Sequence, residues 1–188
     1  MTSAEMQSKT DIRRNSIALR HTIADEEKKR SESRIAENIR NLIIYKKAKT
    51  VALYYPVRGE ADLLILMNDP DKIFVFPKVQ GEDLVFYPAR SRDDFVKGRF
   101  GIPEPCSDEA VPVHDIDVIV VPGVCFDMNN KRLGYGRGYY DRLIQASPET
   151  FTLGVCFDKC CMERLPVDSW DMSVNCVVTQ TSILKIKM

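Results

Sequence analysis

The stretch 118-VIVVPGVCFDMNNKRLGYGRGYYDR-142 decides the fold of this chain. It begins with four consecutive apolar residues, 118–121, which show none of the alternation typical of a half-exposed strand. Such a run indicates a strand that is covered on both faces. Pro122 and Gly123 end it, and a short polar connection and a glycine-rich turn then lead into a helix predicted over 139–145. A buried strand followed by a helix favours an α/β domain with a mostly parallel or mixed central sheet flanked by helices.

Similar signals on both sides extend the pattern. Short segments rich in β-branched and aromatic residues predict further strands over 51–55, 73–76, 84–87, 151–156 and 176–179. Two N-terminal helices are predicted, the second starting near Asp25 as its N-cap, and a crossover helix is predicted over 61–68. The side chains expected on the inner faces are Ile12, Ser16, Leu19 and Ile23 in the first helix and Ile35, Ile39, Leu42 and Ile43 in the second.

The length suits one domain. The chain has 188 residues, of which 44% are apolar, and it contains no internal repeat and no linker-like segment. We therefore expect a single domain over 1–188, with N-terminal helices in 1–47 packed on an α/β core in 48–188. The longest irregular stretch, 91–115, carries three prolines and is a candidate lid or substrate wall.

Charge and cysteine usage exclude several classes of protein. Lysine plus arginine and aspartate plus glutamate both total 27, so the basic excess of a dedicated nucleic-acid binder is missing, and a membrane-surface protein is disfavoured. The six cysteines form no CxxC pair, and the spacing of Cys156, Cys160 and Cys161 is poor for zinc. Because the chain starts with a polar segment and its apolar runs are short, we expect a cytoplasmic protein.

The glycine-rich turn is the densest chemical signal. Gly134, Gly136 and Gly138 alternate just before a helix, so exposed backbone N–H groups and the helix N-terminus can receive phosphate oxygens. The turn also carries Arg132, Arg137 and Arg142, and arginine can bind phosphate through two hydrogen bonds. The spacing matches neither the P-loop nor the dinucleotide fingerprint. A turn that only reverses the chain is the alternative, and the strand, helix and arginines favour a phosphate loop.

Carboxylates and cations elsewhere have two interpretations each. Asp141 could cap the helix or hold Mg²⁺ beside phosphates, with Asp171 as a second ligand. Lys9 and Arg13 share a helix face that Arg20 continues, and this face binds a polyanion or is simply solvated. Glu60 could cap a helix or accept hydrogen bonds from an N–H-rich heterocycle, on which the tyrosines before it could stack. It follows the first predicted strand, where open α/β sheets place their ligands.

Taken together, these segments resemble the 5-formyltetrahydrofolate cyclo-ligase family, also called methenyltetrahydrofolate synthetase. The segment 118–142 is close to the family's VPGxAFD…RLGxGxGYYDR signature. Weaker matches follow in the family's order: KTDIR from Lys9, YYPVRGEAD from Tyr54, FGIPEP from Phe100 and PVDSWDM from Pro166. The resemblance implies a single α/β domain of the kind shared with sugar-phosphate isomerase-like proteins.

The resemblance also implies site residues. The implied ATP contacts are Lys9, Thr10, Asp11, Ile12, Arg13, Arg132, Leu133, Gly134, Tyr135, Gly136, Arg137, Gly138, Tyr139 and Tyr140. The implied folate contacts are Arg13, Tyr55, Glu60, Tyr135, Gly136, Arg137, Gly138 and Tyr139. Asp141 and Asp171 match the magnesium-binding aspartates. Arg137 departs from the family, which usually has Gly, Lys or Met there, but it keeps a positive charge.

The implied reaction is the ATP- and Mg²⁺-dependent cyclisation of 5-formyltetrahydrofolate to 5,10-methenyltetrahydrofolate, with release of ADP and phosphate. Its catalytic charges would be Arg137, Lys9 and Arg13, which neutralise the transferring phosphoryl group. The expected partners are therefore folate and ATP, for a monomer that binds neither nucleic acid nor membrane. Two alternatives are a folate-binding regulator without turnover and a related ligase or kinase that acts on another substrate.

Overall fold

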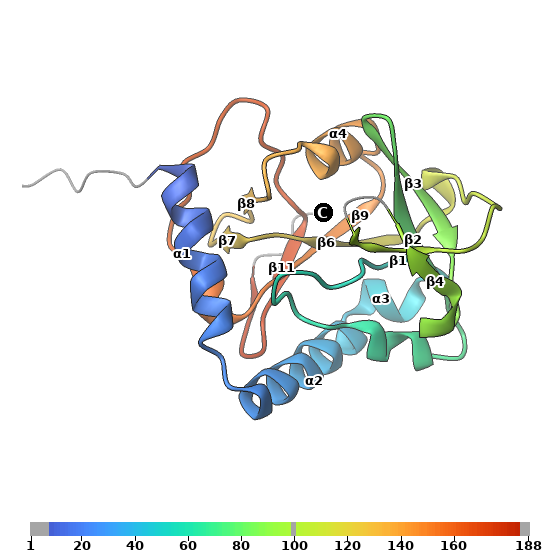
Figure 1. The fold of residues 1–188 in the computed structure, drawn as a ribbon, viewed down its shortest axis with the longest axis horizontal. Coiled ribbons are helices and arrows are strands. Elements are labelled where there is room, and N and C mark those ends of the chain that lie inside the picture. The colour runs from blue at the N-terminus through green and yellow to red at the C-terminus, as the bar shows by residue number, and fades with distance from the viewer. Residues whose placement is uncertain (1–7, 99–100, 185–188) are drawn as a thin grey trace, which may run out of the picture.

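The computed structural model describes residues 8–98 and 101–184, and a seven-stranded mixed sheet forms its centre (Figure 1). In spatial order its strands are β12 (Ile183–Leu184), β11 (Cys176–Val178), β9 (Phe151–Val155), β6 (Val118–Pro122), β1 (Thr50–Ala52), β2 (Ile73–Gln80) and β3 (Asp83–Pro88). The strands from β11 to β2 are parallel, and β12 and β3 at the edges are antiparallel to their neighbours. The predicted mostly parallel or mixed sheet is confirmed.

Helices cover both faces of this sheet. One face carries α2 (Asp25–Asn41), α3 (Ile43–Lys47) and the 3-10 helix η1 (Leu64–Asn68), and the other carries α1 (Lys9–His21) and α4 (Tyr139–Ala146). Figure 1 shows α2 and α3 below the sheet and α4 above it. Further 3-10 turns are η2 (Arg92–Asp94), η4 (Val113–Asp115) and η5 (Asp158–Cys160). None of the helices in the described part of the chain is long and apolar enough to cross a membrane.

The strand β6 is buried on both sides, as its uninterrupted apolar run predicts. Val118 and Val120 pack into the core under α2, whereas Ile119 and Val121 pack into the core under α4. All four side chains are at most 1% exposed. Successive residues of β6 therefore pack into two cores, one on each face of the sheet. This explains why the segment has no polar positions.

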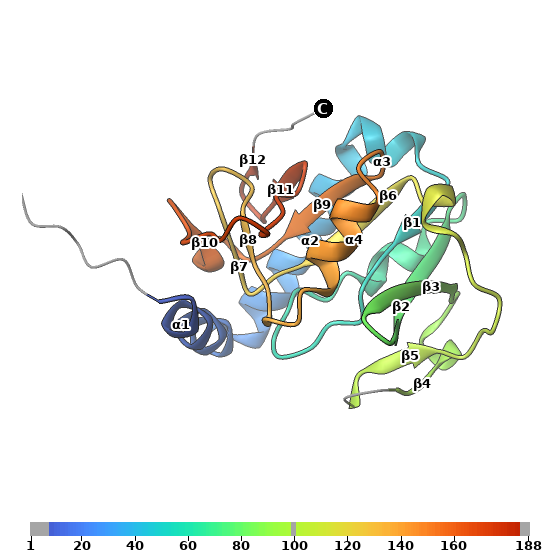
Figure 2. The ribbon, with the colours of Figure 1, turned by 90° about the horizontal axis from the view of Figure 1, so that it is seen from above.

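Two small sheets lie beside the main one. The strand β7 (Cys125–Asp127) pairs antiparallel with β8 (Arg132–Leu133) and parallel with β10 (Cys161–Met162). The hairpin of β4 (Phe95–Lys97) and β5 (Pro103–Pro105) lies next to β2, at the end of the molecule opposite α1 (Figure 2). The stretch 91–115, expected to be irregular, therefore contains short elements. The motif that starts at Phe100 has this residue outside the described part of the chain.

The N-terminal helices differ from prediction in their inner faces. Leu19 and Ile43, both expected inside, are 42% and 71% exposed. Arg20 is buried instead and is only 3% exposed. The helix α2 ends at Asn41, so Ile43 begins a new helix and leaves the apolar stripe. Asp25 is the first residue of α2, and Ala24 is its N-cap.

The crossover from β1 to β2 contains the 3-10 helix η1 where an α-helix was predicted.

The six cysteines are free thiols, and Cys125, Cys156, Cys160 and Cys176 are buried. Burial raises the pKa of the Cys125 and Cys176 thiols to about 11, so both stay protonated at neutral pH.

Candidate active site

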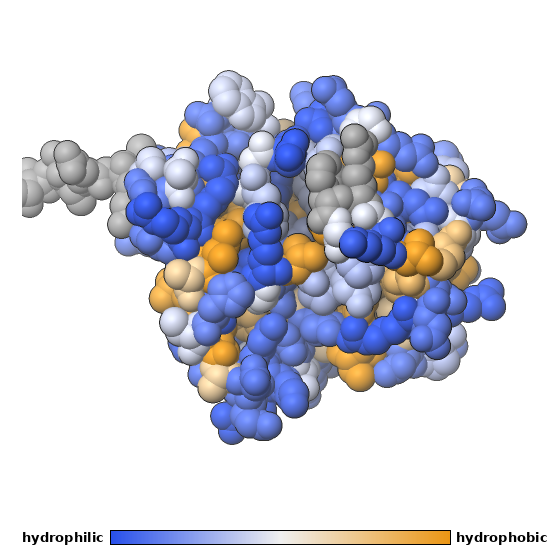
Figure 3. Space-filling view, in the orientation of Figure 1, coloured by the Kyte–Doolittle hydropathy of each residue, from blue (hydrophilic) through white to orange (hydrophobic). Residues whose placement is uncertain are grey.

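A cavity of about 950 Å³ opens at the carboxyl ends of the parallel strands β1, β2 and β6. Its walls come from the segment after β1, from β2 and β3, from the glycine-rich turn with α4, from the start of α1 and from the loop between β10 and β11. Residues 101–104 line it as well, so part of the stretch 91–115 forms a wall of the cavity, as expected. Figure 3 shows the hollowed face that carries it, between α1 on the left and the β3 side on the right. This is where open α/β sheets bind ligands.

The glycine-rich turn adopts a conformation that side chains would disfavour. Gly136 and Gly138 have φ values of +90° and +71°, in the left-handed region. A Cβ on Gly134 would lie only 2.3 Å from an Nη atom of Arg132, so a side chain here would displace the end of that arginine. Gly138 is the N-cap of α4, and no side chain caps this helix end. The N–H groups of the first turn of α4 are therefore available to an anion.

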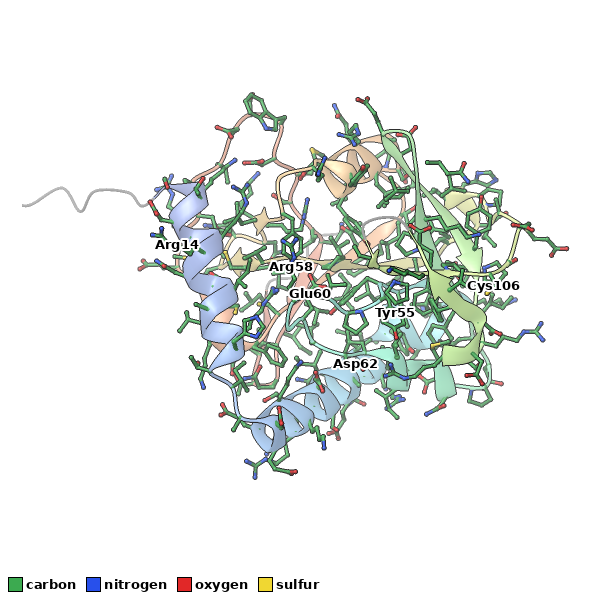
Figure 4. All side chains as sticks on the ribbon, viewed as in Figure 1. Arg14, Tyr55, Arg58, Glu60, Asp62 and Cys106 are labelled. Atoms are coloured by element: carbon green, nitrogen blue, oxygen red, sulfur yellow. The ribbon has the colours of Figure 1, made fainter. Side chains whose placement is uncertain are left out.

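Arginines from distant segments lie over this turn. Arg13 of α1 donates from Nε to the carbonyl oxygen of Gly134 over 2.8 Å. The guanidinium of Arg58 lies 5.1 Å from the ring centroid of Tyr135, as a cation on its face. Figure 4 shows Arg58 near the middle of this face. Arg137 is exposed at the turn and lines the same cavity. The cavity thus has a positively charged region around the glycines.

Lys9, expected to face an anion, is held by two carboxylates. Its Nζ donates to Asp168 over 2.6 Å and also to Asp171. Burial alone would lower the pKa of Lys9, but the two aspartates raise it. Burial likewise favours a higher pKa for Asp171, and the hydrogen bond and charge of Lys9 lower it. Both groups therefore stay ionised at neutral pH.

The two aspartates expected to bind magnesium lie on adjoining segments. Asp141 accepts a hydrogen bond from the backbone N–H of Met172, the residue after Asp171, over 3.2 Å. Its other oxygen pairs with Arg132 over 2.8 Å. Arg132 is buried, and its Nε has no hydrogen-bond partner among the described residues.

The donor set fits a metal that arrives with phosphate. Within residues 8–98 and 101–184, no group of three or more His, Cys, Asp or Glu side chains could hold a metal ion. Mg²⁺, however, typically takes one or two carboxylates and completes its shell with phosphate oxygens and water. Asp141 and Asp171 both line the cavity and supply that number of carboxylates.

Glu60 is the buried acid of the site. It is 4% exposed and accepts hydrogen bonds from the Tyr135 hydroxyl over 3.0 Å and from the Val57 N–H over 3.1 Å. Burial raises its pKa, and these hydrogen bonds and the charge of Arg20 oppose the rise. Glu60 therefore presents a fixed acceptor in an enclosed place rather than capping a helix.

Arg20 lies beneath this acid and was missed as a site residue. It donates to the carbonyl oxygens of Gly123 and Val124 and, over 3.2 Å, to the Tyr135 hydroxyl. The sequence placed Arg20 on the exposed cationic face of Lys9, but it is a buried cation that joins α1 to the start of β7 and to the glycine turn. Arg142 also lines the cavity, and it is held at the turn because it donates to the backbone carbonyls of Glu82 and Arg137.

An aromatic wall closes the other end of the cavity. Tyr55 and Phe76 line it, and both pack edge-on against Phe95 at centroid distances of 5.1 and 4.8 Å. Tyr54 donates its hydroxyl to the Ala61 carbonyl and belongs to the core. Figure 4 shows Tyr55 on the β2–β3 side of Glu60. The arrangement suits a flat heterocycle with a polar edge at Glu60.

Most of the expected contact residues meet in this cavity. Leu133, Tyr139 and Tyr140 line it together with the turn between them, and Lys9 and Arg13 line it from α1. Thr10, Asp11 and Ile12 are not among its lining residues, since Thr10 is exposed, Asp11 pairs with Arg14 and Ile12 lies in the core. Arg58, Asp168 and Trp170 line it as well, and only their place in the matched motifs could have indicated them.

Comparison with known proteins gives consistent matches. The model of the 5-formyltetrahydrofolate cyclo-ligase family matches residues 5–180. The 5-formyltetrahydrofolate cyclo-ligase of Escherichia coli K12 is 31% identical over 146 residues, which cover 72% of this chain and 80% of that protein. The Haemophilus influenzae protein of the same name is 26% identical over 181 residues, covering 91% and 95%.

Solved structures agree with these matches. The Aquifex aeolicus 5,10-methenyltetrahydrofolate synthetase has a TM-score of 0.86 and 37% identity, with 96% of this chain and 93% of that chain covered. A 5,10-methenyltetrahydrofolate synthetase from Mycoplasma pneumoniae shares the fold with a TM-score of 0.74 at 23% identity, covering 93% and 99%.

Proposed function

The chain belongs to the 5-formyltetrahydrofolate cyclo-ligase family of enzymes, and from this premise we propose that it cyclises 5-formyltetrahydrofolate to 5,10-methenyltetrahydrofolate with ATP and Mg²⁺. The observation that carries the proposal is the hydrogen bond between Tyr135 of the glycine turn and buried Glu60. This contact supports the proposal because it brings the glycine turn, our proposed phosphate site, beside the aromatic wall and Glu60. One cavity can therefore hold both co-substrates in contact.

The folate part of the site consists of Glu60, Tyr55 and Phe76. In our proposal the pterin lies along the aromatic wall, and its ring N–H groups donate to the Glu60 carboxylate. Burial of this carboxylate makes each hydrogen bond stronger than it would be in water. The formyl oxygen at N5 then points toward the glycine turn, where Arg13 and Arg137 lie.

The chemical difficulty is that a formyl oxygen is a poor leaving group. The oxygen attacks the γ-phosphorus of ATP, the bond to the ADP oxygen breaks, and an iminium phosphate forms. The N10 amine then attacks the activated carbon, phosphate leaves with the former formyl oxygen, and loss of the N10 proton gives the methenyl bridge. No protein nucleophile is needed. Arg137, Arg13 and Lys9 align the phosphates and neutralise their charge.

Asp141 and Asp171 are the residues that would hold Mg²⁺. The metal would neutralise phosphate charge when bound. In the structure both carboxylates are paired with cations, Arg132 and Lys9, which are themselves suited to phosphate. A metal bound there would share the two aspartates with these cations, which stay beside them.

We also propose that residues 1–188 form one domain, with helices in 1–47 packed on the core, and that it acts as a cytoplasmic monomer with no nucleic-acid or membrane partner. Ile12 of α1 and Ile35 and Ile39 of α2 pack into the two cores of the one sheet, which supports the single domain. Size-exclusion chromatography with light scattering tests the monomer: an elution mass of one 21.5 kDa chain is expected, and a stable dimer would contradict it.

The activity is tested by following the absorbance of methenyl-folate with 5-formyltetrahydrofolate as substrate. Formation of product that requires both ATP and Mg²⁺ is expected. Folate binding without turnover would instead favour a regulator. ATP hydrolysis that appears only with another formylated compound would favour a ligase or kinase for a different substrate.

A further inference from the structure

Trp170 is the one tryptophan of the chain, and it is not part of the hydrophobic core. It lines the rim of the cavity and is 70% exposed. A large aromatic ring exposed at the rim of a cavity can stack on a planar ligand that enters it. We propose that the indole ring of Trp170 stacks on the adenine base of ATP, an inference that rests on the proposed function of the cavity.

The loop that carries Trp170 is held in place. The Asp168 N–H donates to the Asp171 carboxylate over 2.7 Å, and the Asp171 N–H donates to the Asp168 carbonyl over 3.1 Å. Lys9 of α1 binds both carboxylates from the other side. The ring is therefore presented by a turn that is fastened to the body of the protein, and stacking would not require the loop to become ordered first.

The order of the groups along the cavity indicates that the adenine base lies at the Trp170 end. The glycine turn contacts Glu60 through Tyr135 and contacts Arg13 through Gly134, so it lies between the pterin pocket and α1. Lys9 lies one helical turn beyond Arg13 and reaches the Trp170 loop. In Figure 1 this loop, between β10 and β11, rises near the start of α1, whereas β2 and β3 lie on the opposite side.

Phosphoryl transfer requires the same order. The attacking oxygen and the leaving oxygen stand roughly in line on opposite sides of the phosphorus. With the pterin at Glu60 and Tyr55 and the γ-phosphate at the glycine turn, the ADP part must extend away from the pterin. The free end of the cavity in that direction is the rim at Lys9 and Trp170. A second folate ring at Trp170 would lack the buried acceptor that Glu60 supplies.

The test compares ATP with inorganic tripolyphosphate, which has the phosphates but no base. The affinity for each of the two ligands is measured by calorimetric titration in the presence of Mg²⁺. The proteins compared are the wild type, Trp170→Ala and Trp170→Phe. Val167→Ala is the matched control, because Val167 lies on the same loop, is 47% exposed and does not line the cavity. The melting temperature and the affinity for 5-formyltetrahydrofolate of each variant report an intact fold and pterin pocket.

We expect Trp170→Ala to bind ATP about tenfold more weakly, at the lower end of base stacking on an aromatic ring, and tripolyphosphate as the wild type does. Trp170→Phe keeps most of the ATP affinity. In the wild type, ATP changes the emission of the sole tryptophan and tripolyphosphate does not. Equal ATP affinity of Trp170→Ala and wild type, or an equal loss for both ligands, would overturn the inference. Failure of wild type to bind ATP at all would overturn the proposed function itself.

Discussion

The hydroxyl of Tyr135 donates a hydrogen bond to Glu60 over 3.0 Å, across 75 positions of sequence. Arg20, from α1, donates to the same hydroxyl over 3.2 Å. The tyrosine hydroxyl thus bridges a buried arginine and a buried carboxylate, and it joins the glycine turn to the segment after β1. In the proposed function, a shift of the glycine turn on nucleotide binding would therefore also act on Glu60.

Glu60 should make stability depend on pH. Burial raises its pKa in the folded protein, so the folded state holds this proton more tightly than the unfolded chain. Its contribution to stability is therefore fully present below the unfolded pKa and falls as pH rises through the folded pKa. We subtract the free energy of unfolding of Glu60→Gln from that of the wild type. We expect this difference to increase as the pH is lowered from 7 to 5.

Denaturant titrations at several pH values measure this difference. Glu60→Gln should also raise the KM for folate by about tenfold or more, the scale of a hydrogen bond to a charged group, with little effect on the KM for ATP. A difference in stability that rises with pH, or an unchanged KM for folate, would contradict the role of Glu60 as a buried anchor with a raised pKa.

Arg20→Met should destabilise the protein and impair the folate site together. The substitution leaves the carbonyls of Gly123 and Val124 and the Tyr135 hydroxyl without their donor, and we expect a loss of about 2 kcal/mol in the free energy of unfolding. Arg14→Met is the control, because Arg14 lies on the outside of the same helix and pairs with Asp11 (Figure 4). A melting temperature equal to that of the control would disprove the structural role.

Asp141→Asn should raise the Mg²⁺ concentration needed for half-maximal activity and lower kcat more than it weakens folate binding. The variant keeps the shape of the side chain but removes the charge that would attract the metal. Activity is measured over a Mg²⁺ series, with Asp115→Asn, an exposed change outside the cavity, as the control. A wild-type Mg²⁺ dependence would exclude Asp141 as a ligand.

Arg137→Ala should lose at least about 2 kcal/mol of transition-state stabilisation, or about 30-fold in kcat/KM, the scale of a lost donor to a developing negative charge. Arg164→Ala removes an exposed arginine that does not line the cavity and should behave as wild type. If both variants keep the same kcat/KM, Arg137 is only a surface cation.

The sequence by itself determined the local features of this protein. The run 118–121 has no polar position because both of its faces are covered, and the alternate glycines before Tyr139 are needed where φ is positive at Gly136 and Gly138. These are properties of neighbouring residues. The pattern of hydrophobicity and the identity of small residues therefore predicted the buried strand, the turn and the helix after it.

Tertiary structure decided which charges meet. Helical spacing alone favoured Leu19 for the core, yet Arg20 is buried there because the carbonyls of Gly123 and Val124, more than 100 positions away, offer it acceptors. Lys9 is likewise bound by Asp171, 162 positions along the chain. Such pairings depend on how the elements pack and not on their spacing in sequence. They determine whether a cation is buried, paired with a carboxylate or directed at the phosphate turn.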